Sequence, residues 1–329
     1  MSVVVGIDLG YGDTKVISVN DERISFPSRW AKHDGTSWGI GGNIPILSVD
    51  DGTDHFAFGE DANGPNAREP LGDGRLADNA SLPLIGAALW ASGAGADGSP
   101  TQVVLGSGTP LGTFDKELAE SRKALEGRSI KITSLSGEVR QLSIDRLVMR
   151  PQGVGAALYM IEKGLMKQQK GLATVIDVGS RTTDVLTLNL STMEPVLQMS
   201  FSITTGVGDS VSEIAKAIAR ETGFVVPTDV ARESISESVM FKQREVGGPE
   251  FAAPFLQELA DRIVDNMRAN LRSELDRVTA LIPVGGGAAL IGEKLESLAP
   301  GALIKIPEED LPFANALGYK DAAKREIGQ

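Results

Sequence analysis

The chain has 329 residues, 41% of them hydrophobic and 23% charged, a composition suited to two globular domains. It contains no cysteine, which excludes disulfides, thiolate metal sites and a cysteine nucleophile. Its formal net charge of −12 disfavours binding to duplex DNA, because neutralising the phosphates requires a basic face.

The first half of the chain predicts a run of strands followed by alternating helices and strands. Short β-branched runs between turn residues favour strands, and longer apolar or amphipathic runs favour helices. The expected strands are residues 3–8, 14–19, 23–26, 56–58, 102–105, 129–133, 139–144 and 146–149. The expected helices are residues 82–90, 114–126 and 152–167. Residues 30–75 are rich in Gly, Asp and Asn and read as a loop-rich insertion.

The second half repeats this plan, with a hairpin at its start. We expect strands at residues 173–190 (the hairpin), 196–203 and 278–284, and helices at 210–220, 228–237, 254–275, 289–298 and 313–326. The helices between 210 and 277 read as a second, helical insertion.

One pattern, Ile-Asp-x-Gly-x-x-x-Thr, occurs twice, at Ile7–Thr14 and at Ile176–Thr183. Each copy lies between two strand-like runs, so each predicts a hairpin with a glycine-containing turn. Two hairpins of this kind suggest two similar domains on either side of one ligand.

The turns carry the chemistry expected of a phosphate site. Glycine lets a backbone approach a phosphate closely, and successive N–H groups can bind an anion. In the first turn these are Gly10, Tyr11, Gly12 and Asp13, with a hydroxyl from Thr14 and a positive charge from Lys15. In the second they are Gly179, Ser180 and Arg181. A single turn of this type is also typical of an ordinary hairpin; the second copy favours nucleotide binding.

Neither turn matches the common nucleotide motifs. The P-loop spacing is missing, and the dinucleotide glycine turn leads into a helix, whereas these turns lead into strands. A third glycine turn, Gly285–Gly287, follows a buried strand and precedes a helix, where a flat ligand could lie on Gly286 and Gly287. Gly208 and Asp209 open another helix, and the Asp209 and Glu213 carboxylates suit either the helix dipole or a ribose.

Five segments, in order, resemble the superfamily of actin, heat-shock chaperone ATPases and sugar kinases. Asp8–Gly12 resembles its first phosphate motif, Ile176–Thr183 the second, and Pro283–Gly287 its adenosine motif. Pro151–Ala156 and Phe313–Gly318 resemble the two helices that connect its domains. Within the superfamily the chain looks most like the archaeal actin homologues, relatives of the plasmid-segregation actin ParM.

The resemblance implies an α/β fold of two similar RNase H-like (actin-type) domains with a nucleotide cleft between them. Residues 1–150 would form domain I, with the insertion at 30–75 and the C-terminal helix 313–329 packing back on it. Residues 151–312 would form domain II, with the helical insertion at 210–277.

The resemblance also implies ATP or ADP with Mg²⁺. Asp8 and Asp177 would act on the metal through its water shell, and Gln152, a neutral amide, would position the attacking water. The first turn, Gly10 to Lys15, and the second, Gly179 to Arg181, would hold the phosphates. Gly286 and Gly287 would back the adenosine, and Ala231, Arg232 and Ile235 would face the adenine, by analogy with the bacterial actin MreB.

These features predict an actin-like ATPase, slow in hydrolysis, that self-assembles in response to its nucleotide; an adaptor protein is unknown. One alternative is a small-molecule kinase of the same superfamily, for which Asp115 is the nearest candidate for the catalytic aspartate. Another is a nucleotide-sensing scaffold that hydrolyses little.

The rest of the sequence predicts no other partner. No basic leader precedes the first strand, so we expect a cytoplasmic protein without a signal peptide. The apolar stretch 82–91 is too short to cross a bilayer. His33 and His55 lack neighbours spaced for zinc and read as surface residues. Aromatic residues, 5% of the chain, form no platform for single-stranded nucleic acid.

Overall fold

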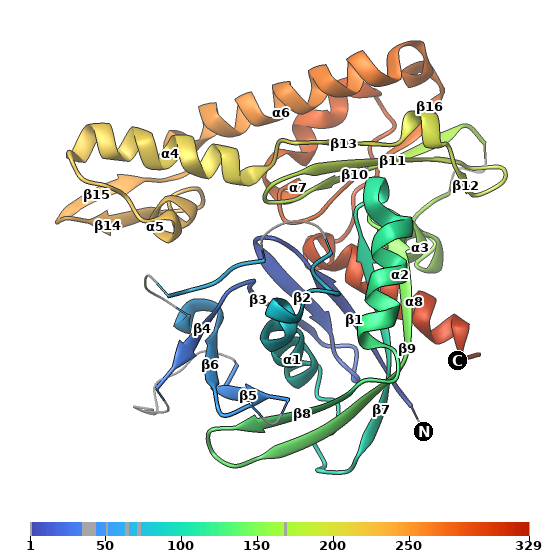
Figure 1. Ribbon diagram of the computed structural model, residues 1–329. Helices are drawn as coiled ribbons and strands as arrows, with labels where there is room; N and C mark the ends of the chain where they lie inside the picture. The colour runs from blue at the N-terminus through green and yellow to red at the C-terminus, as the bar shows by residue number, and fades with distance from the viewer. Residues whose placement is uncertain are drawn as a thin grey trace. The chain divides into compact units, whose positions relative to one another are not determined.

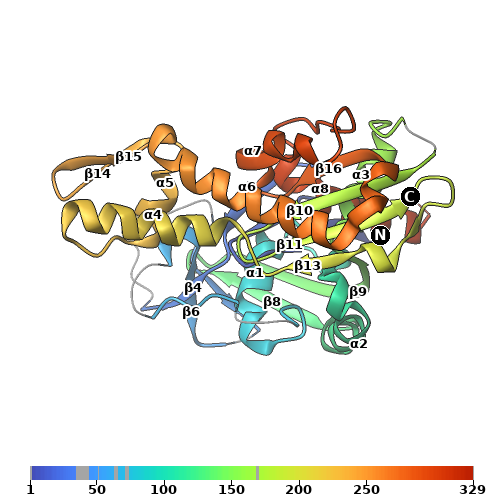
Figure 2. The ribbon, with the colours of Figure 1, turned by 90° about the horizontal axis from the view of Figure 1, so that it is seen from above.

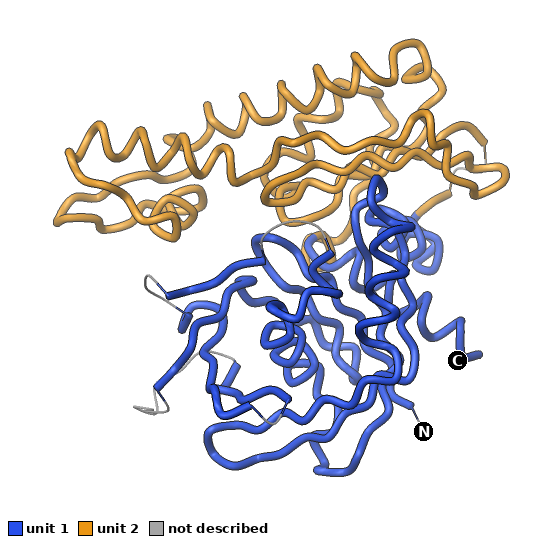
Figure 3. Tube along the Cα trace, in the orientation of Figure 1, with its two compact units in different colours: residues 1–165, 312–329 blue, residues 166–311 orange. Residues whose placement is uncertain are grey.

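The computed structural model describes residues 2–34, 44–50, 52–62, 66–70, 74–167 and 170–328. The chain divides into two compact units (Figure 3). Unit 1 comprises residues 1–165 and 312–329, and unit 2 comprises residues 166–311. The boundary follows Leu165 rather than residue 150, where the sequence analysis placed it. The reason is that helix α3 (Val154–Glu162) packs on α8 (Ala314–Glu326), within unit 1.

Unit 1 is built on a nine-stranded mixed sheet with the strand order β3-β2-β1-β7-β9-β8-β5-β6-β4. The strands β1, β7 and β9 run parallel, and the remaining neighbours are antiparallel. In this order the bounds are β3 (Arg23–Pro27), β2 (Asp13–Ile17), β1 (Val3–Leu9), β7 (Thr101–Thr109), β9 (Val139–Pro151), β8 (Ser129–Ser134), β5 (Leu47–Val49), β6 (His55–Phe58) and β4 (Trp30–His33).

Alternation along β1 sends its side chains into two different cores, one on each face of the sheet. Val5, Ile7 and Leu9 join the larger core with α1 (Leu82–Ala91) and the end of α2 (Phe114–Leu125). Val4 points to the other face, where it packs with Ala322 and Ala323 of α8. Helices therefore cover both faces of the sheet (Figure 1).

Glycines bring α8 against the sheet and against α3. A Cβ added to Gly6 would lie 2.3 Å from the Ala316 carbonyl oxygen, and one added to Gly106 would lie 2.2 Å from that of Tyr319. A Cβ on Gly318 would lie 1.7 Å from the carbonyl oxygen of Gly155 in α3. At these three points backbone meets backbone, and no side chain can be added without moving an element.

Two elements of unit 1 differ from the sequence analysis. The expected helix 152–167 is shorter, since α3 starts after Gly153 (φ 83°) and ends before Gly164 (φ 62°). The described part of the insertion at 30–75 contains β4, β5 and β6, which continue the main sheet through β8. The expected strand 56–58 is confirmed within β6. Expectations that fall on residues 35–43, 51, 63–65 and 71–73 lie outside the described residues.

Unit 2 is built on a five-stranded sheet, in which β10 pairs antiparallel with β11 and parallel with β16. β12 and β13 both pair with β11. The strand bounds are β10 (Leu172–Val178), β11 (Thr183–Asn189), β12 (Glu194–Pro195), β13 (Phe201–Ile203) and β16 (Val278–Val284). The helices are α4 (Val207–Thr222), α5 (Thr228–Glu233), α6 (Pro249–Leu271) and α7 (Ala288–Ile291).

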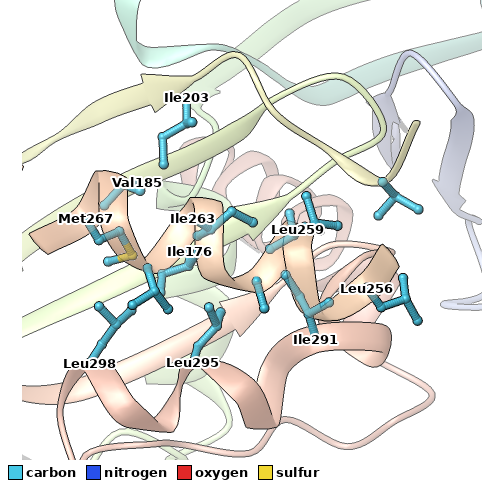
Figure 4. Close-up of a cluster of buried hydrophobic side chains, with 14 of the residues drawn as sticks. Ile176, Val185, Ile203, Leu256, Leu259, Ile263, Met267, Ile291, Leu295 and Leu298 are labelled. Atoms are coloured by element: carbon cyan, nitrogen blue, oxygen red, sulfur yellow. The ribbon is translucent and has the colours of Figure 1, made fainter. Parts of the chain in front are cut away.

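Helix α6 closes the core of unit 2. Its buried residues recur at helical spacing, with Leu256, Leu259, Ile263 and Met267 on one face. Figure 4 shows this face between the sheet residues, such as Ile176, Val185 and Ile203, and the residues Ile291, Leu295 and Leu298 that follow β16. Figure 2 shows α4 beside the N-terminal part of α6.

The insertion at 210–277, expected to be helical, also contains a β-hairpin. Strands β14 (Ser238–Phe241) and β15 (Arg244–Gly247) pair beside α5 and the end of α4 (Figures 1 and 2). The two turn residues, Lys242 and Gln243, both have positive φ, 49° and 63°. Such a turn normally carries Asn or Gly, so no turn signal in the sequence indicated this hairpin.

Candidate functional site

The two copies of the repeated pattern form the same hairpin, one in each unit. In unit 1, Asp8 is the register partner of Lys15 and Leu9 that of Thr14. In unit 2, the corresponding pairs are Asp177 with Asp184 and Val178 with Thr183. The repeated sequence therefore fixes both the turn length and the strand register.

The threonine that ends each copy is a structural residue. Thr14 is fully buried, and its hydroxyl lies 2.8 Å from that of Ser28, beyond β3. Thr183 is also fully buried and donates to the Thr205 carbonyl oxygen at 2.8 Å. The Thr14 hydroxyl is thus used inside unit 1, whereas the sequence analysis expected it to contact a phosphate.

Beside the first turn, one carboxylate and one ammonium group have no partner of opposite charge among the described residues. Asp8 is 7% exposed and makes no hydrogen bond or ion pair with the described residues. Lys15, its neighbour across the hairpin, likewise has no acidic partner among them. A buried charge without a partner is unfavourable. The Asp8 carboxylate and the Lys15 ammonium group therefore suit a ligand that carries both a cation and an anion.

The backbone of the first turn is held tightly. A Cβ on Gly10 would lie 2.6 Å from the Asp13 carbonyl oxygen, and the Gly12 carbonyl accepts a 2.8 Å hydrogen bond from the Ser28 N–H. Between them, the Tyr11 ring lies 4.0 Å from the guanidinium carbon of Arg75. Arg75 lies outside every sequence motif, so it was not predicted to lie beside this turn.

The second turn is anchored on helix α4. The Gly179 and Ser180 carbonyls accept hydrogen bonds from the Val207 and Gly208 N–H groups, at 3.0 and 2.7 Å. A Cβ on Gly208 would lie 2.8 Å from the Ser180 oxygen, so only glycine permits this approach.

At the start of that helix the Asp209 carboxylate accepts from the Gly206 N–H at 3.3 Å. This favours the capping alternative for Asp209. Gly208 and Asp209 therefore fix the turn against α4. Glu213, further along α4, pairs with Lys216 at 2.7 Å. Lys216 bonds to the carboxylate and holds the pKa of Glu213 below its usual value.

The glycine turn after β16 lies directly beside Asp177. Asp177 is the register partner of Val284, and a Cβ on Gly285 (φ 85°) would lie 2.4 Å from its Oδ1 atom. The Gly287 N–H donates to the Val178 carbonyl oxygen at 2.9 Å. Gly286 is exposed, and nothing lies within 4 Å of the place its Cβ would take. Unit 2 thus brings Asp177, the second turn and the glycine turn into one place.

Gln152 is half-buried at the junction of β9 and α3, where its N–H donates to the Thr109 carbonyl at 2.8 Å. Asn315 of α8 caps the same junction, since its Oδ1 accepts from the N–H groups of Gly153 and Ala156, both at 3.1 Å. The Thr109 hydroxyl in turn donates to Glu117, a carboxylate only 4% exposed. Asn315 lies within the motif Phe313–Gly318 but was given no role of its own, and Glu117 was not expected to support the site.

Three residues expected near an adenine lie on or beside α5. Ala231 and Ile235 are buried in the core of unit 2, at 0% and 6% exposure, so they do not face a ligand. Arg232 is exposed on α5, which packs on α4. Arg181, in the second turn, is also exposed. In unit 1, Asp115, the candidate acid of a kinase, is exposed at the start of α2.

Within the described residues, no three His, Cys, Asp or Glu side chains gather to hold a metal. His33 and His55 are register partners across β4 and β6. A Mg²⁺ bound with a nucleotide needs no such cluster, because phosphates and waters supply most of its ligands. The unpaired Asp8 carboxylate fits this kind of site.

Comparison with known proteins identifies the family. Residues 6–155 match the family described as the N-terminal domain of actin-like proteins, and residues 175–297 the C-terminal domain of MreB-like archaeal actin homologues. An archaeal actin homologue of Thermoplasma acidophilum is 60% identical over 99% of this chain and 100% of its own length. The chain belongs to the family of archaeal actin homologues.

Solved structures agree with this membership. A crystal structure of an archaeal actin homologue in complex with ADP has a TM-score of 0.90 and 57% identity, covering 98% of this chain and 99% of its own. A ParM filament from Clostridium botulinum has a TM-score of 0.82 at 21% identity, over 99% of this chain and 100% of its own, and shares the fold. The expected actin fold and the resemblance to archaeal actin homologues and ParM are confirmed. None of the described helices is both long and apolar enough to span a membrane.

Proposed function

We propose that this archaeal actin homologue is a slow ATPase that binds ATP or ADP with Mg²⁺ and self-assembles in response to the nucleotide. The observation that carries the proposal is the repeated hairpin. Each unit has a buried aspartate at a strand end beside a glycine-containing turn, and in unit 2 a second glycine turn adjoins it. The 57% identical relative was crystallised with ADP, which supports nucleotide binding here.

In this proposal the turns hold the phosphates through backbone N–H groups and nearby positive charges. Gly10, Tyr11, Gly12, Asp13 and Lys15 act from unit 1, and Gly179, Ser180 and Arg181 from unit 2. Gly286 and Gly287 back the adenosine: Gly286 is exposed and leaves a flat surface, and Gly287, whose Cβ would lie 2.4 Å from Val178, lets the turn pack closely on β10. Gly208 and Asp209 position the second turn, and Arg232 is a candidate for the adenine edge.

The carboxylates of Asp8 and Asp177 orient water molecules of the metal ion. A bound Mg²⁺ would stabilise negative charge on the phosphate oxygens. Gln152 accepts and donates hydrogen bonds without taking a proton, so it orients the attacking water without deprotonating it. This accounts for slow hydrolysis.

Phosphate release from ATP·Mg²⁺, measured without any acceptor molecule, tests the activity. Gln152→Ala should lower the rate roughly tenfold to a hundredfold and leave nucleotide affinity unchanged, because only water positioning is lost. Gln141→Ala, at an exposed glutamine of β9, the strand that Gln152 directly follows, is the matched control and should keep the wild-type rate. Equal rates for both variants would refute the role of Gln152. Absence of phosphate release from the wild type would refute the ATPase, and release that requires an acceptor would favour the kinase alternative.

Sedimentation with ATP·Mg²⁺ and with ADP tests self-assembly. The ParM relative of the same fold forms a filament, and this motivates the proposal. We expect pelleting that depends on the nucleotide. Failure to pellet over a range of salt and pH would remove assembly and leave the ATPase. An Asp8→Ala variant that still binds ATP as tightly as the wild type would instead support a metal-independent scaffold.

A further inference from the structure

Arg75 is a buried cation that no described residue neutralises. Arg75 follows Gly74, which has a φ of 78°, and is only 6% exposed. Among the described residues its guanidinium makes no hydrogen bond and no ion pair. Its guanidinium makes a cation–π contact with the Tyr11 ring, whose centroid lies 4.0 Å from the guanidinium carbon.

This arrangement leaves the guanidinium donors of Arg75 available to an anion. A guanidinium keeps its charge at every pH at which proteins fold, and it carries five N–H donors. The aromatic ring interacts with the cation through its face and satisfies none of those donors. Although the residue is only 6% exposed, its nitrogens are not among the enclosed polar atoms that lack a hydrogen bond, so these donors remain accessible to an anion that arrives at the turn.

The position of Arg75 indicates which anion. Tyr11 is the second of the four turn residues, and the Lys15 Nζ lies 3.6 Å from the place a Gly10 Cβ would take; Lys15 has no acidic partner among the described residues either. Two positive charges therefore converge on one turn whose backbone suits an anion. Arginine binds phosphate through two parallel hydrogen bonds, which its planar donor set matches.

We propose that Arg75 is a phosphate-binding residue of the first turn. The Tyr11 ring holds its guanidinium, and its free N–H edge donates to phosphate oxygens of the bound nucleotide. This inference rests on the proposed function, and it adds a ligand that lies far from every sequence motif.

A purely structural arginine would behave differently in two measurements. If Arg75 only stacks on Tyr11, replacing it should lower the melting temperature and leave affinity unchanged. If it awaits a phosphate, replacing it with an uncharged side chain of similar length removes the phosphate contact and keeps the packing of the stem. The protein without nucleotide should then be as stable or more stable, while nucleotide binding weakens.

The experiment compares the wild type with Arg75→Met, Arg75→Lys and the control Arg122→Met, an exposed arginine on α2. Calorimetric titration with ADP and with ATP·Mg²⁺ gives affinity, and thermal unfolding without nucleotide gives stability. We expect Arg75→Met to bind roughly tenfold to a hundredfold more weakly, the range for a lost charge-assisted hydrogen bond. Its melting temperature should be unchanged or higher. Arg75→Lys should bind with intermediate affinity, and Arg122→Met like the wild type. Wild-type affinity in Arg75→Met, or a lower melting temperature without a loss of affinity, would overturn the inference.

Failure of the proposed function gives a different result. If the wild type binds neither nucleotide, the proposed function falls, and inorganic pyrophosphate becomes the probe for Arg75. Stabilisation of the wild type by pyrophosphate, absent in Arg75→Met, would support the arginine as a phosphate ligand. No stabilisation of the wild type would overturn that role as well.

Discussion

The contact between α3 and α8 gives a prediction that depends only on geometry. In Gly318→Ala the new Cβ would lie 1.7 Å from the Gly155 carbonyl oxygen and 2.4 Å from its carbon. Ordinary contact requires roughly 1.5 Å more separation, and both atoms are backbone, so no side chain can rotate away. Overpacking costs about 1–3 kcal/mol in most cores, and we expect the upper end here.

The expected loss is measurable by thermal unfolding followed by circular dichroism. About 3 kcal/mol corresponds to a fall of roughly 6–12 °C for a unit of this size. Alanine has a higher helix propensity than glycine, by about 1 kcal/mol, so propensity alone would raise stability. The control is Gly112→Ala, where nothing lies within 4 Å of the new Cβ and we expect no shift. A melting temperature of Gly318→Ala equal to or above that of the wild type would refute this account of the helix contact.

Two further predictions concern the glycine turn and a buried lysine. Gly286→Ala should leave stability unchanged, because the new Cβ meets no atom within 4 Å. The same variant should bind the nucleotide at least about tenfold more weakly. Unchanged affinity in a titration would remove Gly286 from the site. Lys320 of α8, 2% exposed, bonds to the Ser18 carbonyl and lies 2.7 Å from Asp21. Burial lowers the pKa of Lys320 below its usual value, although Asp21 opposes the shift. Folding therefore carries a penalty for the charged lysine, present at neutral pH and relieved as the pH rises toward the unfolded value of 10.5. The stability of the wild type relative to Lys320→Met should accordingly increase with pH over that alkaline window in denaturant titrations, and a constant or falling difference would contradict the sign.

Local patterns in the sequence were enough to predict the two repeated hairpins and the approximate positions of the helices, but not the hairpin β14–β15. The repeat from Ile7 to Thr14 sets its own turn length, and the buried run of β1 alternates between two cores. The glycine turn after β16 follows a strand of apolar residues, so its position was also predictable. These features depend on neighbours within about ten residues.

The features that sequence reasoning missed depend on contacts between distant segments. Arg75 and Glu117 carry no local signal, and only packing shows that both are buried. Ala231 and Ile235 resembled ligand contacts, but the apolar face of α5 turns into the core. The domain boundary was misplaced for the same reason, since the partner of α3 is a helix at the other end of the chain.

The return of α8 to unit 1 has a consequence for synthesis on the ribosome. Unit 2 is one continuous stretch, residues 166–311, whereas unit 1 needs residues 312–329, which are made after it. Until α8 emerges, Val4, Val104 and Val148 on one face of the first sheet lack the cover of Ala322 and Ala323, and such exposed apolar surface favours aggregation. The unit that begins first is therefore completed last, and a nascent chain that stops before α8 leaves that surface open.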